Sequence, residues 1–281
     1  MRDDTVAIGG RLGSTLTVLG HVAVDRNEPV YIVWNDEACC PMACKVFDTL
    51  RYAEREASLL SRLSHPGIVR CFGLLEERYL LMEFLEGRRL DRLADARPSG
   101  RLGVNDAIRA SVHIASALVH SHRRSVIHLD VKPSNIVVVN GRPILCDFGI
   151  ARRIGDERPS RRQGTLDYMA PEECQAHEVG PAADVFGLGA TIYELMAGDM
   201  PWDPGDDDAY PQITEPPTPL RHHRRDVSPD LADLVMSCLR PDPAGRPALP
   251  DLMVGLHRHI TAGPGVWPGG FDPFAHAEGA P

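Results

Sequence analysis

The pattern of apolar and polar residues along the chain changes character near Gly87. Before that residue, short apolar runs alternate with turn-forming residues, which is typical of strands. After it, apolar residues recur three and four positions apart, which is typical of helices that bury one face. The pattern therefore predicts an α+β fold, with a small β-rich part followed by a larger helical part.

The same periodicity places the individual strands and helices. In the first part, strand-like runs cover residues 15–24, 29–34, 42–47, 68–75 and 79–85, and a helix is predicted over 51–63. In the second part, helical spacing covers residues 104–124, 182–197 and 229–240, interrupted by short apolar runs at 126–130, 136–139 and 143–149. Residues 203–219 are rich in Pro and Asp, which predicts an irregular surface loop.

The two ends of the chain lack this periodicity. Residues 1–14 are polar and contain glycine, so we expect a flexible N-terminal segment. Residues 261–281 contain Gly and Pro with few aliphatic side chains, so we expect a disordered tail. Between them we predict a β-rich lobe over residues 15–85 and a helical lobe over residues 86–260.

Composition argues against several classes of protein. Of 281 residues, 43% are hydrophobic, which is enough for a sizeable core, and the net charge is −9. That charge argues against a nucleic-acid partner held by general electrostatics. We find no apolar run approaching the roughly 20 residues of a membrane span and no signal-peptide pattern. The 7 cysteines, an odd number scattered through apolar segments, indicate reduced thiols and a cytoplasmic location.

The choice of cation is the most informative feature of the composition. Of the 30 basic residues, only Lys45 and Lys132 are lysine, and all others are arginine. Lysine presents a compact ammonium with three donors, whereas arginine presents a planar fork. Retention of lysine at two positions in an otherwise arginine-based chain suggests that both ammonium groups have a chemical task.

Lys132 lies in the segment HLDVKPSN at residues 128–135, and the segment DFG follows at residues 147–149. The two carboxylates and the amide of these segments suit phosphoryl transfer, because one carboxylate can act as a base near a hydroxyl while oxygen ligands hold Mg²⁺. Singly, a turn Asp, a surface Lys and a capping Asn are the more common interpretations. Together, these residues favour a phosphoryl-transfer site.

These segments resemble motifs of the eukaryotic-type (Hanks-type) serine/threonine protein kinases, and of their bacterial members in particular. HLDVKPSN is similar to the catalytic loop of that family and DFG to its metal-binding motif, and the match continues in order over roughly residues 15–260. The resemblance implies a bilobal, protein-kinase-like fold. It also implies ATP and Mg²⁺ as cofactors and a protein substrate with a Ser or Thr hydroxyl.

The resemblance assigns a role to each polar residue of these motifs. Asp130 would be the base that accepts the proton of the substrate hydroxyl, and Lys132 would neutralise charge on the γ-phosphoryl group. Asn135 and Asp147 would hold Mg²⁺. Thr165, in a GTLDYMAPE segment that resembles the end of the kinase activation loop, would bridge Asp130 and Lys132.

The other lysine has an expected partner. The segment MACKV resembles the third-strand V-A-I-K motif of kinases, so Lys45 would contact the α- and β-phosphates and would pair with Glu56. An independent argument supports this pair. Glu56 lies three, four and seven positions before Leu59, Leu60 and Leu63, and a carboxylate on such a buried helical stripe needs a cation.

The resemblance also implies an adenine site. YLLMEFLEG at residues 79–87 resembles the kinase hinge, with Met82 as gatekeeper and the backbones of Glu83 and Leu85 contacting adenine. Val30 and Ala43 would complete the nucleotide-binding residues.

Three further residues resemble structural landmarks of the family. Asp184 would brace the backbone of the catalytic loop, although a simple N-cap explains this residue equally well. Glu172 and Arg246 would form a buried ion pair with an architectural role.

The chain departs from the kinase pattern at two places. The three positions of the glycine-rich loop are Ala23, Asp25 and Glu28, and the two carboxylates would repel a triphosphate unless they point outward or a further cation intervenes. Leu129 replaces the arginine that normally pairs with a phosphorylated activation loop. We therefore expect weak dependence on activation-loop phosphorylation.

Two alternatives to an active protein kinase remain at this stage. One is a pseudokinase that acts as a regulatory scaffold, which the acidic loop favours and the intact Asp130, Lys132 and Asp147 oppose. The other is a small-molecule kinase of the aminoglycoside-phosphotransferase type, which would lack the APE segment at residues 170–172. A regulatory partner protein is a further expectation, because no sensor domain accompanies the two lobes.

Overall fold

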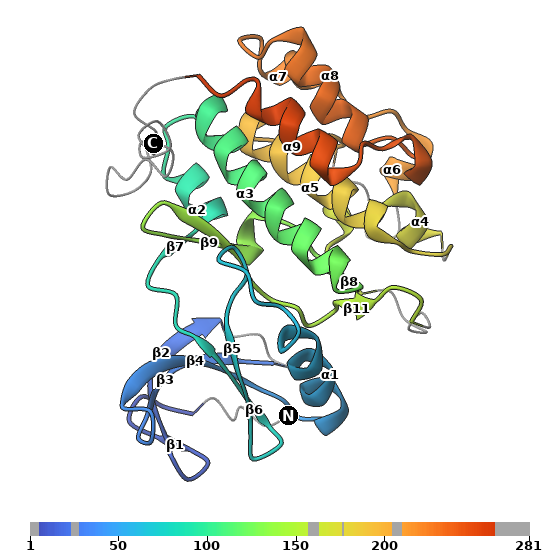
Figure 1. Ribbon diagram of the computed structural model, residues 1–281. Helices are drawn as coiled ribbons and strands as arrows, with labels where there is room; N and C mark the ends of the chain where they lie inside the picture. Colours follow the sequence, from blue (N-terminus) through green and yellow to red (C-terminus); the bar gives the residue numbers. More distant parts are fainter. Residues whose placement is uncertain (1–5, 24–27, 157–162, 176, 204–209, 262–281) are drawn as a thin grey trace, which may run out of the picture. The chain divides into compact units, whose positions relative to one another are not determined.

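The computed structural model describes residues 6–23, 28–156, 163–175, 177–203 and 210–261. The chain divides into two compact units, shown in Figure 1. The first unit contains the chain up to residue 64 together with residues 69–86, and the second contains residues 65–68 and the chain from residue 87 onward. The first unit ends at residue 86, one residue beyond the boundary predicted from the sequence.

Residues 65–68 belong to the second unit although they lie between two parts of the first, and the sequence pattern does not predict this. Ile68 forms an isolated bridge with Leu145, and the backbone N–H of Leu145 donates to the Gly67 carbonyl at 2.9 Å. These backbone contacts attach the segment to the second unit, although its neighbours on both sides belong to the first.

The first unit is an antiparallel sheet of six strands in the order β1-β2-β3-β4-β6-β5, with one helix packed against β5 and β6. Its elements are β1 (Arg11–Leu12), β2 (Leu16–Ala23), β3 (Val30–Asn35), β4 (Cys40–Val46), α1 (Leu50–Leu60), β5 (Cys71–Leu75) and β6 (Tyr79–Glu83). Alternate residues of β3 and β4, namely Tyr31, Val33, Met42 and Cys44, enter one buried cluster. This alternation is what the sequence pattern predicts for a sheet with one packed face.

The sheet begins earlier than the sequence predicts. The expectation of a flexible N-terminal segment is wrong for Arg11 and Leu12, which pair with β2, and Leu12 is only 5% exposed. Gly9 and Gly13 adopt positive φ angles of 85° and 58° and form the turns on either side of β1. A two-residue strand between glycines is too short to produce a periodic signal. Residues 1–5 of that predicted segment lie outside the described part of the chain.

The second unit is built around helices. Its elements are β7 (Arg88–Arg89), α2 (Leu90–Asp95), α3 (Val104–Arg123), β8 (Val126–Ile127), β9 (Ile136–Val139), β10 (Arg142–Leu145), β11 (Arg152–Arg153), α4 (Pro171–Cys174), α5 (Pro181–Ala197), α6 (Pro211–Thr214), α7 (Leu220–His223), α8 (Pro229–Cys238) and α9 (Leu249–His257). The helices predicted over 104–124, 182–197 and 229–240 are confirmed within two residues at each end. In the described part of the chain, no helix combines the length and apolar character that crossing a bilayer requires.

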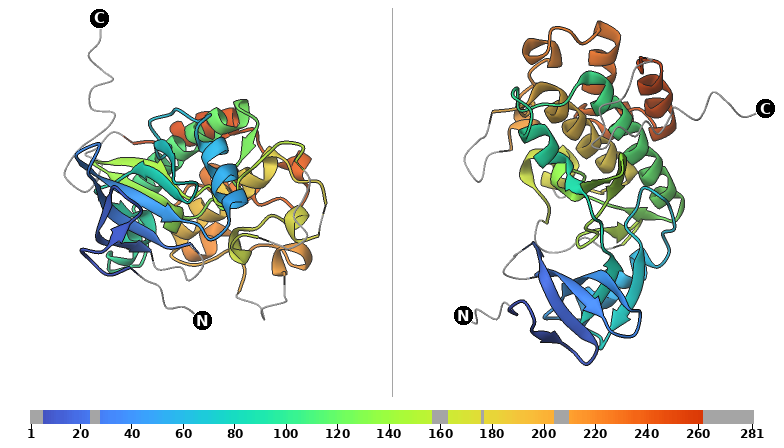
Figure 2. Two further views of the ribbon diagram at one scale, coloured as in Figure 1. Left: turned by 90° about the horizontal axis from the view of Figure 1, so that it is seen from below. Right: turned by 90° about the vertical axis from the view of Figure 1, so that its left-hand side faces the viewer.

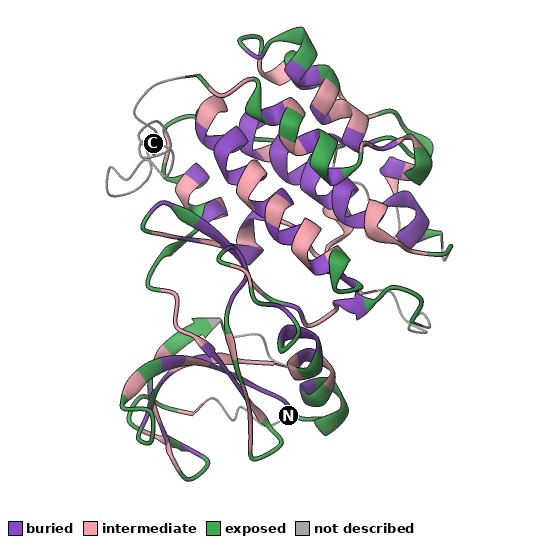
Figure 3. Cartoon of the chain, viewed as in Figure 1, coloured by how far each residue is buried: buried purple, intermediate pink, exposed green. Residues whose placement is uncertain are grey.

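Helix α5 is the centre of this unit. Nearly all of its residues are buried, and it packs against α3 and α8 (Figure 3). The views in Figure 2 show α3 and α5 side by side. A β-carbon added at Gly189 would lie 2.5 Å from the Cβ of Cys238, so α5 and α8 approach as closely as they do only because this residue is glycine. A helix that is apolar on all sides is expected to form the middle of a core.

The predicted loop at 203–219 is only partly irregular. Residues 204–209 lie outside the described residues, but α6 follows them and buries Gln212, which is 4% exposed. The Gln212 amide donates to the carbonyls of Leu166 and Met169 at 3.0 and 3.2 Å. These contacts hold α6 in place, a four-residue helix that the proline-rich sequence does not predict. Most of the predicted disordered tail also lies outside the described residues, which end at Thr261.

The predicted pair of Glu172 and Arg246 is present and buried. Two guanidinium nitrogens of Arg246 donate to the two carboxylate oxygens of Glu172 at 2.7 Å each. The same guanidinium donates to the carbonyls of Arg240, Pro241 and Ala182. Because every donor of the fork has a partner, this pair joins α4, the start of α5 and the segment before α9 into one fixed unit.

Replacement of Arg246 with Met should leave the Glu172 carboxylate buried without its cation. We expect the free energy of unfolding to fall by about 3–5 kcal/mol, measured by urea denaturation. The matched control is Arg221→Met, because Arg221 is exposed on α7 and its loss should cost less than about 0.5 kcal/mol. Equal effects of the two substitutions would contradict a structural role for the buried pair.

Glu173, next to this pair, is a buried carboxyl group. It is 7% exposed and accepts a hydrogen bond from the Ala170 N–H at 3.0 Å, and burial raises the pKa of Glu173 to about 8. An unfolded Glu has a pKa near ~4.3, so between these pH values the folded protein holds a proton that the unfolded chain has released. Stability should therefore fall as pH rises through this window and level off above it.

The Glu173→Gln variant keeps the acceptor for Ala170 and removes the titration. We expect the variant to gain in free energy of unfolding over the wild type as pH rises from about 4.5 to 8, by at most about 1.4 kcal/mol per pH unit. Urea denaturation at a series of pH values measures this, with the exposed Glu178→Gln as control. A difference between Glu173→Gln and wild type that does not change with pH would contradict a neutral, buried Glu173.

Candidate active site

The predicted pair of Lys45 and Glu56 forms inside the first unit. The Nζ atom of Lys45, on β4, lies 2.9 Å from Oε2 of Glu56, on α1. Their side chains are only 7% and 2% exposed. Glu56 shares the buried stripe of α1 with Leu59 and Leu60, as its spacing predicts, and the ammonium supplies the cation that a carboxylate in this environment needs.

The sheet gathers the predicted nucleotide-binding residues on one face. In the strand register, Val30 lies opposite Lys45 and Ala43 lies opposite Met82. Cross-strand partners share a face of the sheet, and residues two apart on one strand share it too, so these four residues lie together. The opposite face is filled by the core cluster that contains Met42 and Cys44. The face with Lys45 therefore lies outside that core cluster.

The two remaining predicted adenine contacts lie at the end of this sheet. Glu83 is the last residue of β6 and pairs in register with Met42. Leu85 follows the strand and is half-buried. Glu83 therefore lies at the strand end, where its N–H donates to the Arg70 carbonyl at 2.8 Å, and Leu85 lies two residues beyond it.

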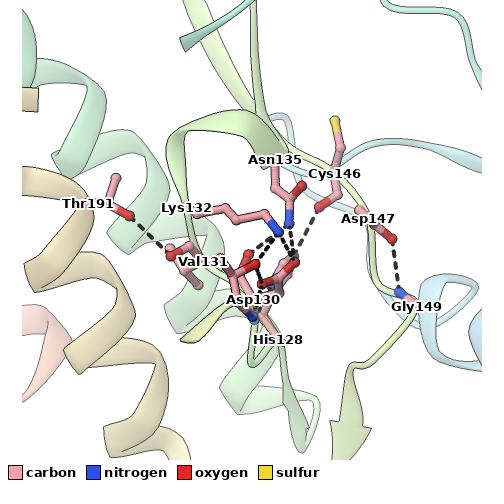
Figure 4. Close-up of polar contacts among 10 residues, drawn as sticks. His128, Asp130, Val131, Lys132, Asn135, Cys146, Asp147, Gly149 and Thr191 are labelled. Carbon is pink, nitrogen blue, oxygen red and sulfur yellow. Dashed lines mark hydrogen bonds and ion pairs between the residues drawn. The ribbon is translucent and has the colours of Figure 1, made fainter. Parts of the chain in front are cut away.

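In the second unit, Asp130, Lys132 and Thr165 are in direct contact. The Nζ atom of Lys132 lies 2.7 Å from Oδ2 of Asp130 (Figure 4) and donates a short hydrogen bond to the Thr165 hydroxyl. The hydroxyl and the backbone N–H of Thr165 donate to Oδ1 of Asp130 at 2.9 and 3.2 Å. Thr165 thus bridges Asp130 and Lys132, as the sequence predicts.

Asn135 fixes the other side of Asp130. Its side-chain nitrogen donates to the Asp130 carbonyl at 2.9 Å and to Oδ2 of the Asp130 carboxylate at 2.7 Å, as Figure 4 shows. Both amide hydrogens are therefore used, and the amide oxygen is directed to the other side of the side chain. Four donors in total hold the Asp130 carboxylate, so its orientation is set before any ligand arrives.

The residues present at the predicted metal site fit Mg²⁺ in their chemistry. Asp147 is exposed, has a positive φ of 58°, and accepts the Gly149 N–H at 3.3 Å through Oδ1. The Asn135 amide oxygen and the Asp147 carboxylate are hard oxygen donors of the kind that Mg²⁺ uses beside water and phosphate ligands. Among the described residues, no group of three or more His, Cys, Asp or Glu side chains forms a further metal centre.

The buried carboxylate of Asp184, near the start of α5, braces the segment that carries Asp130. Oδ2 accepts the N–H of His128 at 2.9 Å, and Oδ1 accepts the N–H of Leu129 at 2.8 Å. His122 from α3 lies 2.7 Å from Oδ2 through its Nε2 atom. Burial by itself would raise the pKa of Asp184, but the hydrogen bond and charge of the His122 ring and the hydrogen bond from the His128 backbone N–H outweigh it and hold the pKa below its usual value. The hydrogen bonds of Asp184 therefore match the bracing role predicted from the sequence. Asp184 is not an N-cap, because Gly180 occupies the N-cap position of α5.

The sequence analysis missed the support that His128 gives. Its Nδ1 atom accepts the Asp130 N–H at 3.2 Å, so the hydrogen is on Nε2, which donates to the Cys146 carbonyl at 3.0 Å. Its ring also packs edge-on against Phe148, with centroids 4.6 Å apart. His128 thus ties the Asp130 segment to the Asp147 segment, and its place inside HLDVKPSN was the only available signal.

Other supporting residues have no motif that could reveal them. The Thr191 hydroxyl, on α5, donates to the Val131 carbonyl at 3.1 Å (Figure 4). Gln212 holds the backbone just after Thr165 from a loop that the sequence marks as irregular. Both residues act through backbone carbonyls, which sequence spacing does not locate.

The structure describes the side chains at two of the positions that depart from the kinase pattern, Leu129 and Glu28. Leu129 is 7% exposed and has a positive φ of 67°, so an apolar side chain is buried at the position where the kinase pattern has an arginine. Glu28 does not point outward: its Oε2 atom lies 2.9 Å from Nζ of Lys45. Asp25 lies outside the described residues, and so does the side chain of Ala23.

Comparison with known proteins identifies the family. The protein kinase domain family matches residues 28–255. The chain is 32% identical to serine/threonine-protein kinase PknB of Mycolicibacterium smegmatis over 68% of its length, and 36% identical to serine/threonine-protein kinase PkaA of Streptomyces coelicolor over 75%. These alignments cover 33% and 40% of the two relatives, so the chain matches well under half the length of each.

A solved structure supports the same assignment. The kinase domain of Mycobacterium tuberculosis PknI superimposes with a TM-score of 0.71 at 25% identity, over 90% of this chain and 99% of that one. The fold, the match over most of the chain and the arrangement around Asp130 agree, and the chain belongs to the protein kinase domain family, among relatives that are bacterial serine/threonine kinases.

Proposed function

We propose that this protein is a serine/threonine protein kinase that transfers the γ-phosphoryl group of ATP to a Ser or Thr hydroxyl of a protein substrate. The observation that carries the proposal is the contact of Asp130 with Lys132, Thr165 and Asn135. A carboxylate, an ammonium and an amide in this arrangement suit a base with charge neutralisation beside it. The names of the relatives support a protein substrate.

Asp130 is proposed to orient the substrate hydroxyl and to take its proton. The carboxylate already accepts four donors, of which the Thr165 N–H is the longest at 3.2 Å, so the substrate hydroxyl would replace one of them. Lys132 would then remain beside the oxygen that attacks and would offset negative charge on the transferred group. Thr165 would keep Lys132 and Asp130 at their present separation.

Asn135 and Asp147 are proposed to hold Mg²⁺, which when bound neutralises charge on the nucleotide phosphates. Lys45, fixed by Glu56, is proposed to contact the α- and β-phosphates. Val30, Ala43 and Met82 would contact the base from their shared sheet face, and the backbones of Glu83 and Leu85 would hydrogen-bond it.

We further propose a cytoplasmic protein that a partner regulates. All seven cysteines lie in the described residues and are free thiols, which supports a reducing compartment. A buried Leu129 stands directly before Asp130, where the kinase pattern has the arginine that receives a phosphorylated loop, which supports control by a regulatory partner over control by activation-loop phosphorylation.

One contact favours the pseudokinase alternative. The ion pair of Glu28 with Lys45 sets a carboxylate on the ammonium that nucleotide phosphates would need. The intact set around Asp130 opposes this alternative, and phosphate transfer decides between the two functions.

Transfer of labelled phosphate from Mg-ATP, to the protein itself and to a generic basic protein, tests the proposed function. We expect Asp130→Asn to reduce the rate by a factor of about 10²–10⁴, because the base is lost, and Lys45→Met to reduce it strongly as well. Matched controls are Asp233→Asn on the exposed side of α8 and Arg51→Met on the exposed side of α1. Transfer that survives Asp130→Asn, or no transfer by the wild type, would contradict the proposal.

Thr165 offers a test of the positioning role. Because its hydroxyl joins Lys132 to Asp130, Thr165→Val should lower kcat by roughly 10- to 100-fold, the range expected for a lost hydrogen bond to a charged group, with little change in the KM for ATP. Thr165→Ser keeps the hydroxyl and should restore most of the rate. Equal loss of kcat in the Ser and Val variants would show that the hydroxyl is not what matters.

A further inference from the structure

Two carboxylates share the ammonium group of Lys45. Oε2 of Glu28 and Oε2 of Glu56 each lie 2.9 Å from Nζ of Lys45. The Lys45 side chain is only 7% exposed, and its ammonium also lies 5.2 Å from the centre of the Phe47 ring. Little room is therefore left around this ammonium for a third anion while both carboxylates remain.

The two carboxylates differ in how readily they can leave. Glu56 is 2% exposed and belongs to the buried stripe of α1, so its separation from Lys45 would leave a charge in a dry environment. The Glu28 side chain is 34% exposed and comes from the segment just before β3, where water can replace Lys45 as its partner. Glu28 is therefore the exchangeable partner of the pair.

We propose that Glu28 competes with the phosphate groups of a nucleotide for the ammonium of Lys45, and so sets the affinity of this protein for ATP. A carboxylate and a phosphate offer the same kind of anionic oxygen to an ammonium donor. The inference rests on the proposed function, because it takes Lys45 as the phosphate contact. It explains how a carboxylate at a glycine-loop position is accommodated in the free protein.

The competition has a specific consequence for ligands of different charge. A triphosphate has to displace Glu28 from Lys45 and then meets the displaced carboxylate nearby, whereas adenosine has no group that needs Lys45. Removal of the Glu28 charge should therefore strengthen the binding of Mg-ATP and leave adenosine unaffected.

Calorimetric titration of the full chain with Mg-ATP and with adenosine tests this proposal. We expect Glu28→Gln to bind Mg-ATP about five- to tenfold more tightly than the wild type, and adenosine within about twofold of it. Glu28→Asp keeps the charge on a shorter side chain that no longer reaches Nζ, so it should recover part of the gain. The control is Glu54→Gln, which removes a carboxylate from the exposed side of α1.

Each outcome decides the proposal. Tighter Mg-ATP binding by Glu28→Gln, with a partial gain in Glu28→Asp, supports it, and so does binding that becomes measurable only in the Gln variant. An unchanged affinity for Mg-ATP, an equal gain for adenosine, an equal gain in Glu54→Gln, or no gain in Glu28→Asp would overturn it. Thermal denaturation of each variant confirms that the fold is retained.

The two proposals can fail separately. A wild-type protein that binds Mg-ATP and transfers phosphate, with an affinity that Glu28→Gln does not change, overturns the competition and leaves the kinase function standing. If neither the wild type nor Glu28→Gln binds Mg-ATP, the competition fails together with the proposed phosphate contact of Lys45.

Discussion

The carboxylate of Asp184 is the acceptor on which the conformation of the 128–135 segment depends. It takes the backbone N–H groups of His128 and Leu129 from within α5, a helix nearly all of whose residues are buried. Leu129 has a positive φ, a conformation that non-glycine residues adopt only when their surroundings impose it. Because Asp184 holds the N–H of that residue, the backbone turns there and presents Asp130 to Lys132, Thr165 and Asn135. The position of Asp130 therefore depends on a carboxylate in the buried core of the second unit.

Each unit stabilises its own functional groups with buried opposite charges. Glu56 holds Lys45 in the first unit, while Glu172 and Arg246 fix the region around α4 and α5 in the second. Such pairs contribute little net stability compared with an apolar core, but the loss of one partner leaves the other charge buried and unpaired. Both pairs instead fix the positions of the elements that carry them, because each buried charge is neutralised by its partner.

The two lysines illustrate why an arginine-based chain keeps an ammonium. Lys132 reaches Asp130 and Thr165 with a single nitrogen, and Lys45 reaches Glu28 and Glu56 in the same way. A planar guanidinium presents its donors as a fork, which suits Arg246 opposite Glu172 but not two acceptors that converge on one point. The same property makes Lys45 open to competition, because any anionic oxygen of the right reach can take one of its donors.

By itself, the sequence determined the α+β fold, the long helices α3, α5 and α8, and the pairs of Lys45 with Glu56 and Glu172 with Arg246. The helices follow from periodicity, which is local, and the need of Glu56 for a cation follows from its place on an apolar stripe. The pairing of Glu172 with Arg246, 74 positions apart, follows only from the resemblance of their segments to kinase motifs. Only the tertiary structure decided the rest. Strand β1, the support from Thr191 and Gln212, and the inward direction of Glu28 all depend on contacts between distant parts of the chain. Most of these contacts run through backbone groups or through a side chain that could equally have faced water, and for that physical reason no pattern of residue types records them.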